Sequence, residues 1–191
     1  MTMLFAPLGS FRGWPTPALL RILVDRSGNA LVEAALVFPL LIILFFGVSE
    51  LCEGFIAKRR VESAAYTAAD LVARLQAVNS TDLVALKAMI DETIRPLPVA
   101  TVGLVVTSVI ADAQNATTVA WSDALGPGVV ANTAGSTIAV PGGLTLPNTT
   151  IILAQVGYTF HSTLSALIVD DIALQAQAYQ RPRSVVQVAR Y

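Results

Sequence analysis

Charged side chains are scarce in this sequence. Of its 191 residues, only 13% are Asp, Glu, Lys or Arg, whereas 54% are hydrophobic, and the mean hydropathy is +0.66. An average soluble domain carries about 25% charged residues, so the composition argues against a cytosolic protein. The net charge is −1, and no Lys or Arg occurs between Arg95 and Arg181. The chain therefore offers no basic stripe for phosphates, and we expect no nucleic-acid partner.

Cysteine and histidine are almost absent. A single cysteine, Cys52, excludes an internal disulfide and a CxxC pair, and a single histidine, His161, argues against a histidine-based metal site. We interpret Cys52 as a small apolar residue at the end of a membrane helix, with an intersubunit disulfide as the alternative. No G-x-S-x-G motif nominates a catalytic serine, and Asp170-Asp171 is typical of an exposed acidic turn. We expect a non-enzymatic protein with no metal and no cofactor.

The longest apolar run lies near the N-terminus. Residues 34–49 are uncharged, and tolerating Glu33 extends the uncharged run back to Asn29. The resulting length of about twenty residues is what a helix needs to cross ~30 Å of hydrocarbon. Residues 40–46 are apolar on every face, which argues against a core helix of a soluble protein. The sequence predicts that residues 28–49 form one membrane-inserted helix.

Basic residues flank this run on both sides. Three arginines precede it, and residues 58–60 supply three more cations, so counting Lys and Arg does not orient the span. A cleaved secretory signal peptide is an alternative, because the basic leader suits an n-region. The apolar run is longer than a typical h-region, and no small-x-small site follows it in a loop. These two features favour a retained anchor.

Glu33 is out of place within such a span. A carboxylate there costs about 2.5–3.5 kcal/mol on insertion scales, so it needs a partner or a purpose. It is the fifth residue after Gly28, which closes the basic leader. This arrangement resembles the type IV prepilin signal, in which a membrane aspartyl protease on the cytoplasmic face cuts after the glycine. The resemblance implies that a prepilin peptidase removes residues 1–28 by cutting between Gly28 and Asn29.

Cleavage at this point would have a second consequence. It frees an α-amino group at Asn29, a cation that the Glu33 of a neighbouring subunit could neutralise in a low-dielectric bundle. The apolar helix stays attached, so the product can sit in the membrane or pack into a filament core. Pro39 frees the carbonyl of Ala35 and predicts a kinked or loosened helix. An ordinary membrane-helix proline and a role in filament packing both remain open for it.

More narrowly, the segment VEAALVFPLLIILFFGVSELCEGF looks like the TadE-like family of tight-adherence pilus proteins. The shared features are Val32-Glu33, the small pair Ala34-Ala35, Pro39, and Gly47 with Glu50. The resemblance implies a minor pilin or pseudopilin of a Tad/Flp-type type IV pilus and secretion system involved in adherence. It implies as partners a prepilin peptidase, other Tad pilus subunits, inner-membrane assembly proteins and the lipid bilayer. It also implies a single-pass bacterial inner-membrane protein with a cytoplasmic N-terminus and a periplasmic C-terminal domain, incorporation into an extracellular pilus being a further option.

The rest of the chain predicts an α+β domain. A stripe of small apolar residues recurs at spacings of three and four and predicts that the helix continues over residues 50–78, packed against the protein's own sheet or against sister helices. The stripe comprises Ala57, Val61, Ala64, Ala68, Val72 and Leu75. Within residues 79–191, Ser80 or Thr81 would cap a second helix that ends at Arg95-Pro96.

Beyond the second helix the hydrophobic period changes to two. Alternating faces predict strands at 100–107, 152–160 and 172–178, with shorter strands at 117–121 and 136–140. We therefore expect a pilin-like α+β fold: a long N-terminal helix whose first half (29–49) is transmembrane, a short helix, and an antiparallel sheet. Two other functions remain open, an uncleaved signal-anchored periplasmic binding or scaffolding protein of the envelope, and a tethered hydrolase.

Overall fold

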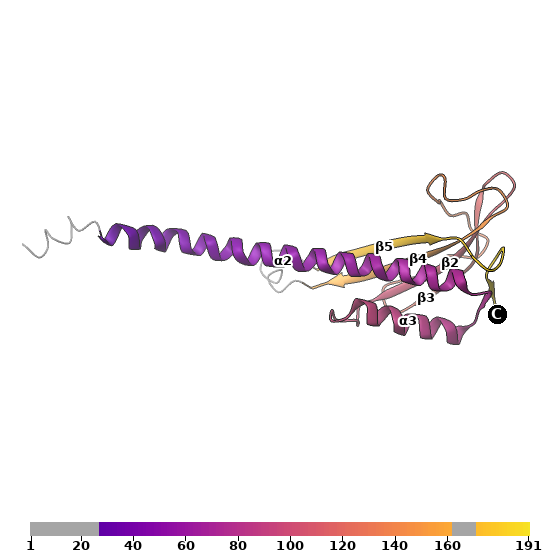
Figure 1. The fold of residues 1–191 in the computed structure, drawn as a ribbon, viewed down its shortest axis with the longest axis horizontal. Helices are drawn as coiled ribbons and strands as arrows, with labels where there is room; N and C mark the ends of the chain where they lie inside the picture. Colours follow the sequence, from indigo (N-terminus) through magenta and orange to yellow (C-terminus); the bar gives the residue numbers. More distant parts are fainter. Residues whose placement is uncertain (1–26, 162–170) are drawn as a thin grey trace, which may run out of the picture. The chain divides into compact units, whose positions relative to one another are not determined.

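A computed structural model describes residues 27–161 and 171–191 (Figure 1). Most of the predicted leader 1–28 and the predicted acidic residue Asp170 therefore lie outside the described residues. The chain divides into two compact units, residues 1–46 and residues 47–191. The described part of the first unit is helical throughout, whereas the second unit holds two helical segments and all of the described strands.

The long N-terminal helix, α2, spans Ser27–Arg74 and continues through Pro39 without a break. It ends four residues before Val78, where the stripe of small apolar residues predicts its end. The difference arises because strand β1, Ala77–Val78, pairs in parallel with the C-terminal strand β6, Ala189–Arg190. This pairing joins residues more than a hundred positions apart, so local periodicity carries no sign of it.

The second helix, α3, spans Ser80–Ile94 and buries the face that the sequence predicts, with Ile90 and Ile94 fully buried. Its N-cap is Asn79 rather than Ser80 or Thr81. The Asn79 side chain accepts a hydrogen bond from the Asp82 backbone at 2.9 Å, and the Asp82 carboxylate accepts one from the Asn79 backbone at 3.0 Å. The residues three positions after Ser80 and Thr81 are Leu83 and Val84, so neither alternative would complete this reciprocal capping box.

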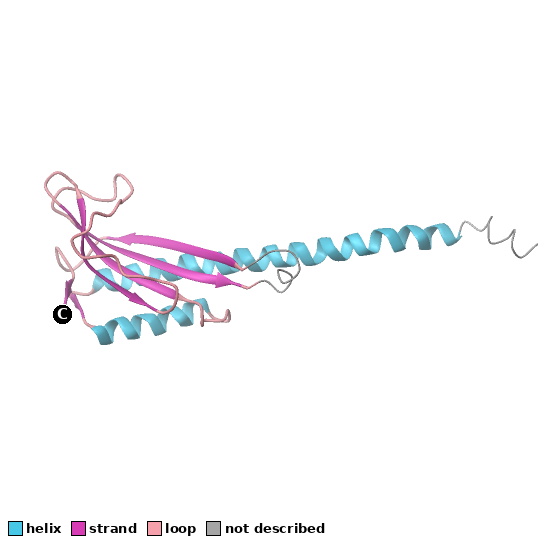
Figure 2. Ribbon diagram, turned by 180° about the vertical axis from the view of Figure 1, so that it is seen from behind, coloured by secondary structure: helices cyan, strands magenta, loops and turns pink. Residues whose placement is uncertain are grey.

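Four antiparallel strands form the sheet, in the order β3-β2-β4-β5. Their bounds are Gly103–Ala111 for β2, Thr117–Leu125 for β3, Thr150–Phe160 for β4 and Ile172–Gln180 for β5. The predicted strand at 136–140 is wrong, because this segment makes only an isolated bridge between Thr118 and Thr137. The α+β class with an antiparallel sheet is confirmed, and Figure 2 shows the helices and the sheet of this unit as separate layers.

The core of the second unit lies between α2, α3 and one face of the sheet. From β2 and β4 it receives alternate side chains, including Leu104, Ile152 and Val156. From α2 it receives the small apolar stripe, whose members from Ala57 to Val72 are at most 1% exposed. The prediction that this stripe packs on the protein's own sheet is confirmed, except that Leu75 is 38% exposed. Fully buried alanines bring the helix backbone close to the strands.

The C-terminal segment ties this core together. The Arg183 amide donates a hydrogen bond to the carbonyl of Ala73 at 2.9 Å, which satisfies one of the orphan carbonyls at the end of α2. The buried indole N–H of Trp121 donates to the carbonyl of Val188 at 2.8 Å. The Arg190 guanidinium bonds both carboxylate oxygens of Asp123, at 2.8 and 3.2 Å. The last residues of the chain therefore hold the end of α2 against β3.

We expect Ala65→Leu to destabilise the second unit by about 1–3 kcal/mol, because Ala65 is 0% exposed and a larger side chain would push α2 away from the sheet. Thermal unfolding of the full chain in detergent, followed by circular dichroism, measures the effect. The matched control is Ala88→Leu, since Ala88 is exposed on α3. Equal melting temperatures for the two variants would contradict tight helix-to-sheet packing at Ala65.

We expect Trp121→Phe to cost about 1–3 kcal/mol, because it leaves the Val188 carbonyl without its donor in a buried position. Denaturant unfolding of the full chain measures this loss. In the same variant, hydrogen exchange at Ala189 should accelerate more than exchange at Val106 in the central strand. Unchanged exchange at Ala189 would show that the indole bond does not hold the C-terminal segment.

Candidate functional site

The first unit exposes a continuous apolar helix surface. Every residue of α2 from 30 to 48 is exposed, and twelve of those from 31 to 46 are large hydrophobic residues. Leu36 is 75% exposed and Phe45 is 68% exposed. A fully buried side chain of this kind gains about 1.5–3 kcal/mol relative to exposure in water. By its length and composition, this helix can cross a membrane.

Gly28 lies in the first turn of this helix. Apart from its chain neighbours and the adjacent backbone of the helix, no described heavy atom lies within 4 Å of the position that a Cβ would take there. The first-turn amides of a helix have no partner within the helix, which makes this turn the easiest to unwind. The bond between Gly28 and Asn29 therefore lies where a protease meets the least resistance from helix structure.

Glu33 lies just over one turn beyond Gly28, on the exposed apolar helix. No described residue forms a hydrogen bond or an ion pair with its carboxylate. In a membrane or a helix bundle, this carboxylate would have to find a cation outside the described chain or be neutralised. The position of Glu33 is thus compatible with the predicted pairing to a neighbouring subunit's amine, and that pairing stays a prediction.

The three basic residues at 58–60 differ in their surroundings: one is bonded within the domain, and the other two are exposed. The Arg60 guanidinium donates to the carbonyls of Thr93 and Arg95, where it satisfies the C-terminal end of α3. Lys58 and Arg59 are exposed. One of the three cations that follow the apolar run is therefore part of the domain's own structure.

The other residues considered in the sequence analysis, His161, Asp171 and Cys52, do not come together in a catalytic or metal-binding site among the described residues. His161 Nδ1 lies 2.6 Å from an Asp171 carboxylate oxygen, and both side chains are 55% exposed, so the pair links the ends of β4 and β5 at the surface. This contact between two strand ends was not predicted from the sequence. Among the described residues, no group of three or more His, Cys, Asp or Glu could hold a metal ion. Cys52 is an exposed free cysteine on α2.

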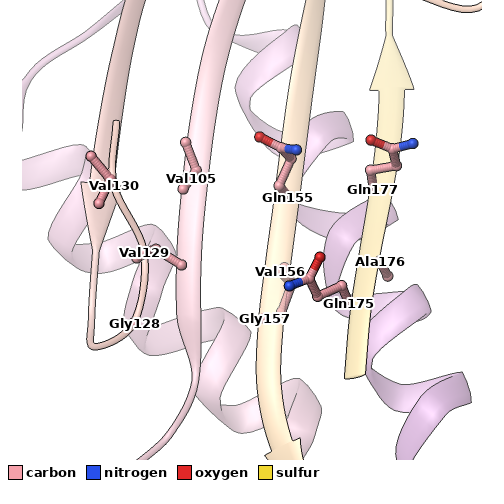
Figure 3. A pocket seen from close by; sticks show the side chains of 10 residues that line it. All are labelled: Val105, Gly128, Val129, Val130, Gln155, Val156, Gly157, Gln175, Ala176 and Gln177. Atoms are coloured by element: carbon pink, nitrogen blue, oxygen red, sulfur yellow. The ribbon is translucent and has the colours of Figure 1, made fainter. Parts of the chain in front are cut away.

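A groove of about 430 Å³ lies on the sheet face opposite the helices (Figure 3). Gln155 faces Gln177 across β4 and β5, and the loop at 128–130 forms one wall. Gly103 makes that wall possible, because a Cβ there would lie 2.5 Å from Val129. The lining holds neutral amides and apolar side chains without an acid, a base or a nucleophile, so it offers hydrogen bonds rather than catalysis.

Residues 28–70 match the family model of TadE-like proteins. No curated protein and no solved structure matches the chain. The matched range begins at Gly28, takes in Glu33 and the whole apolar run, and ends at Asp70 within the stripe that packs on the sheet. This match confirms the resemblance seen in the sequence: the segment from Gly28 to Asp70 is similar to TadE-like proteins.

Proposed function

We propose that this chain is a structural subunit or assembly factor, a minor pilin or pseudopilin, of a Tad/Flp-type type IV pilus and secretion system that serves adherence. One observation carries the proposal. The TadE-like segment is a helix whose apolar residues are all exposed from 30 to 48, and it begins with Gly28 followed by Glu33. The role is structural rather than catalytic, because a helix of this kind anchors and assembles.

Processing is the first step of the proposed mechanism. A prepilin peptidase at the cytoplasmic face cuts between Gly28 and Asn29, in the exposed first turn of α2. The absence of a side chain at Gly28 lets the protease approach the backbone closely. The cut leaves the apolar helix attached to the domain, in a single-pass inner-membrane protein with residues from about 51 onward in the periplasm.

Assembly through the apolar helix is the second step. After cleavage, Asn29 carries an α-ammonium group four residues before Glu33, which is about 6 Å along a helix. In a bundle of such helices, the Glu33 carboxylate of one subunit neutralises the Asn29 amine of the next. The apolar surface from 30 to 48 exchanges lipid for the helices of other Tad subunits, with the help of inner-membrane assembly proteins.

A second candidate function uses the groove of Figure 3. In an uncleaved signal-anchored protein, residues 47–191 would act as a periplasmic binding or scaffolding domain, and the glutamine-lined groove would be its contact surface. Glu33 would then be incidental. The two functions differ at one point that can be measured, the N-terminus of the protein in the cell.

We expect the chain to begin at Asn29 when it is expressed with an active prepilin peptidase and to keep its leader without one. Intact-mass measurement distinguishes the two forms. Gly28→Val should abolish processing, because a branched side chain would fill the open approach to the backbone. The matched control Gly47→Val, at another helix glycine with open space around it, should be processed normally. A chain that keeps its leader beside an active peptidase, or that is cut after Ser49, would contradict the pilin function.

We expect Glu33→Ala to be cleaved normally but to reduce pilus formation at least about tenfold. Removing the carboxylate leaves the neighbouring Asn29 amine without a counter-ion, and breaking one side of a buried ion pair costs about 3–5 kcal/mol. Counting pili by electron microscopy measures the loss. The control is Glu53→Ala, an exposed glutamate on α2. Normal pilus numbers in Glu33→Ala would remove the assembly role of this residue without affecting the cleavage proposal.

A further inference from the structure

Positive charge gathers where β5 ends. No Lys or Arg occurs between Arg95 and Arg181, and Arg183 then follows Arg181 after a single residue. The chain leaves β5 beside the end of α2 (Figure 1), where the Arg183 amide bonds the carbonyl of Ala73. The last turn of α2 carries a third arginine, Arg74. Two segments that are far apart in the sequence therefore bring their cations to one place.

These cations outnumber the carboxylates beside them. The Asp70 carboxylate accepts a hydrogen bond from Arg74 on one oxygen and from Arg183 on the other. Arg181 forms no ion pair with any residue that the structure describes. Asp112, the acid that follows β2, bonds two backbone amides of its own turn instead. Three guanidinium groups and one carboxylate leave two positive charges without a counter-ion.

Two of these arginines line an open pocket of about 450 Å³. Pockets that bind small molecules commonly have volumes of about 300–1,000 Å³. The lining takes in the chain from Tyr179 to Arg183, together with Leu144 and Ile151 from the other side. No Asp or Glu is among the lining residues. The pocket therefore combines uncompensated cations with apolar walls.

Arg181 is held in place within this pocket. Its Nε and Nη2 atoms both donate to the carbonyl oxygen of Leu144, at 3.3 and 2.9 Å. An arginine carries five N–H donors in one plane, so three of them remain for another acceptor. Guanidinium groups bind carboxylate and phosphate oxygens through two parallel hydrogen bonds. One carbonyl thus orients the guanidinium and leaves its other edge available to an anion.

Tyr179 adds a neutral donor to the same pocket. Alternate residues of an extended chain point to one face, which accounts for Tyr179 and Arg181 both lining the pocket. The Tyr179 hydroxyl has no hydrogen-bond partner in the described part of the chain. Burial raises the pKa of this phenol, so the hydroxyl stays protonated at neutral pH and can donate.

The surplus of two charges favours a doubly charged anion. A carboxylate carries one negative charge and would leave one cation uncompensated. A phosphate monoester carries about −1.5 to −2 charges at pH 7 and presents three acceptor oxygens. Leu144, Ile151 and Pro182 supply apolar surface beside the arginines, which inorganic phosphate would leave unused. The organic part of an ester can cover this surface.

We propose that this pocket binds a small organic phosphate monoester. Arg181 binds two phosphate oxygens through its remaining N–H groups, and the Tyr179 hydroxyl donates a further hydrogen bond. Arg183 adds its charge from the side of α2. The organic part of the ester packs against Pro182 and Leu144. Binding at this pocket does not depend on the pilus function.

Calorimetric titration of the full chain in an uncharged detergent tests this site. The probes are phenyl phosphate, phenyl sulfate and inorganic phosphate, each also titrated into detergent alone. Phenyl sulfate has nearly the shape of phenyl phosphate but only one negative charge. We expect saturable binding of phenyl phosphate, at least about fivefold tighter than that of either other probe, because only phenyl phosphate supplies both the second charge and the apolar ring.

Variants of the pocket test the role of each donor. Arg181→Gln should weaken phenyl phosphate binding at least about tenfold, because it removes the charged fork. Arg181→Lys should weaken it less, since it keeps the charge but loses the paired donors. Tyr179→Phe should weaken it about twofold or more, because it removes one neutral donor. Arg59→Gln is the matched control: it removes an exposed arginine elsewhere on α2 and should bind like the parent chain.

Equal thermal unfolding of the parent and the variants shows that the fold is intact. If Arg181→Gln unfolds, the comparison of the three probes on the parent chain decides.

Four results would overturn the proposal. The parent chain may give no saturable binding of phenyl phosphate, or it may bind phenyl sulfate equally well, which removes the role of the second charge. Inorganic phosphate may bind as tightly as phenyl phosphate, which removes the organic part. Unchanged binding by a folded Arg181→Gln variant would place the ligand elsewhere. None of these results bears on cleavage after Gly28, so failure here is distinguishable from failure of the pilus function.

Discussion

The described part of the chain leaves the apolar surface of α2 uncovered in its first half. From residue 30 to residue 48, α2 presents Leu, Ile, Val and Phe on all sides. The free-energy cost of leaving them in water exceeds what the folding of a domain of this size provides, because domains are stable by only about 5–15 kcal/mol. Lipid or other apolar helices must therefore surround this segment, which is why anchoring and assembly are the functions that its chemistry supports.

The same helix changes its partner within the second unit. From Ala57 onward its small residues are buried against the protein's own sheet, and the C-terminal segment closes over its last turn. Alanine suits this contact, since it favours the helix and brings the helix backbone close to the strands. The domain consequently uses one face of the sheet for its own core, and the groove lies on the opposite face.

Much of this architecture follows from local patterns in the sequence. The apolar run, the alanine stripe and the change of period from three or four to two predict the helices, the helix-to-sheet packing and the α+β class. What the sequence could not show depends on distant residues. The pairing of Ala77 with Ala189 shortens α2, and the contact between His161 and Asp171 joins two strand ends. The N-cap at Asn79 is the exception, because its capping box with Asp82 was readable in the sequence.

The central claim is that residues 30–48 lie in a bilayer and that the domain beyond them does not. Nitroxide labels at Leu40 and at Tyr66, each introduced as a single cysteine in a Cys52→Ala chain in lipid vesicles, test this claim by electron paramagnetic resonance. We expect oxygen to relax the label at position 40 more than a water-soluble nickel complex does, and we expect the reverse at position 66. A label at position 40 that the nickel complex reaches as readily as the label at position 66 would contradict the account.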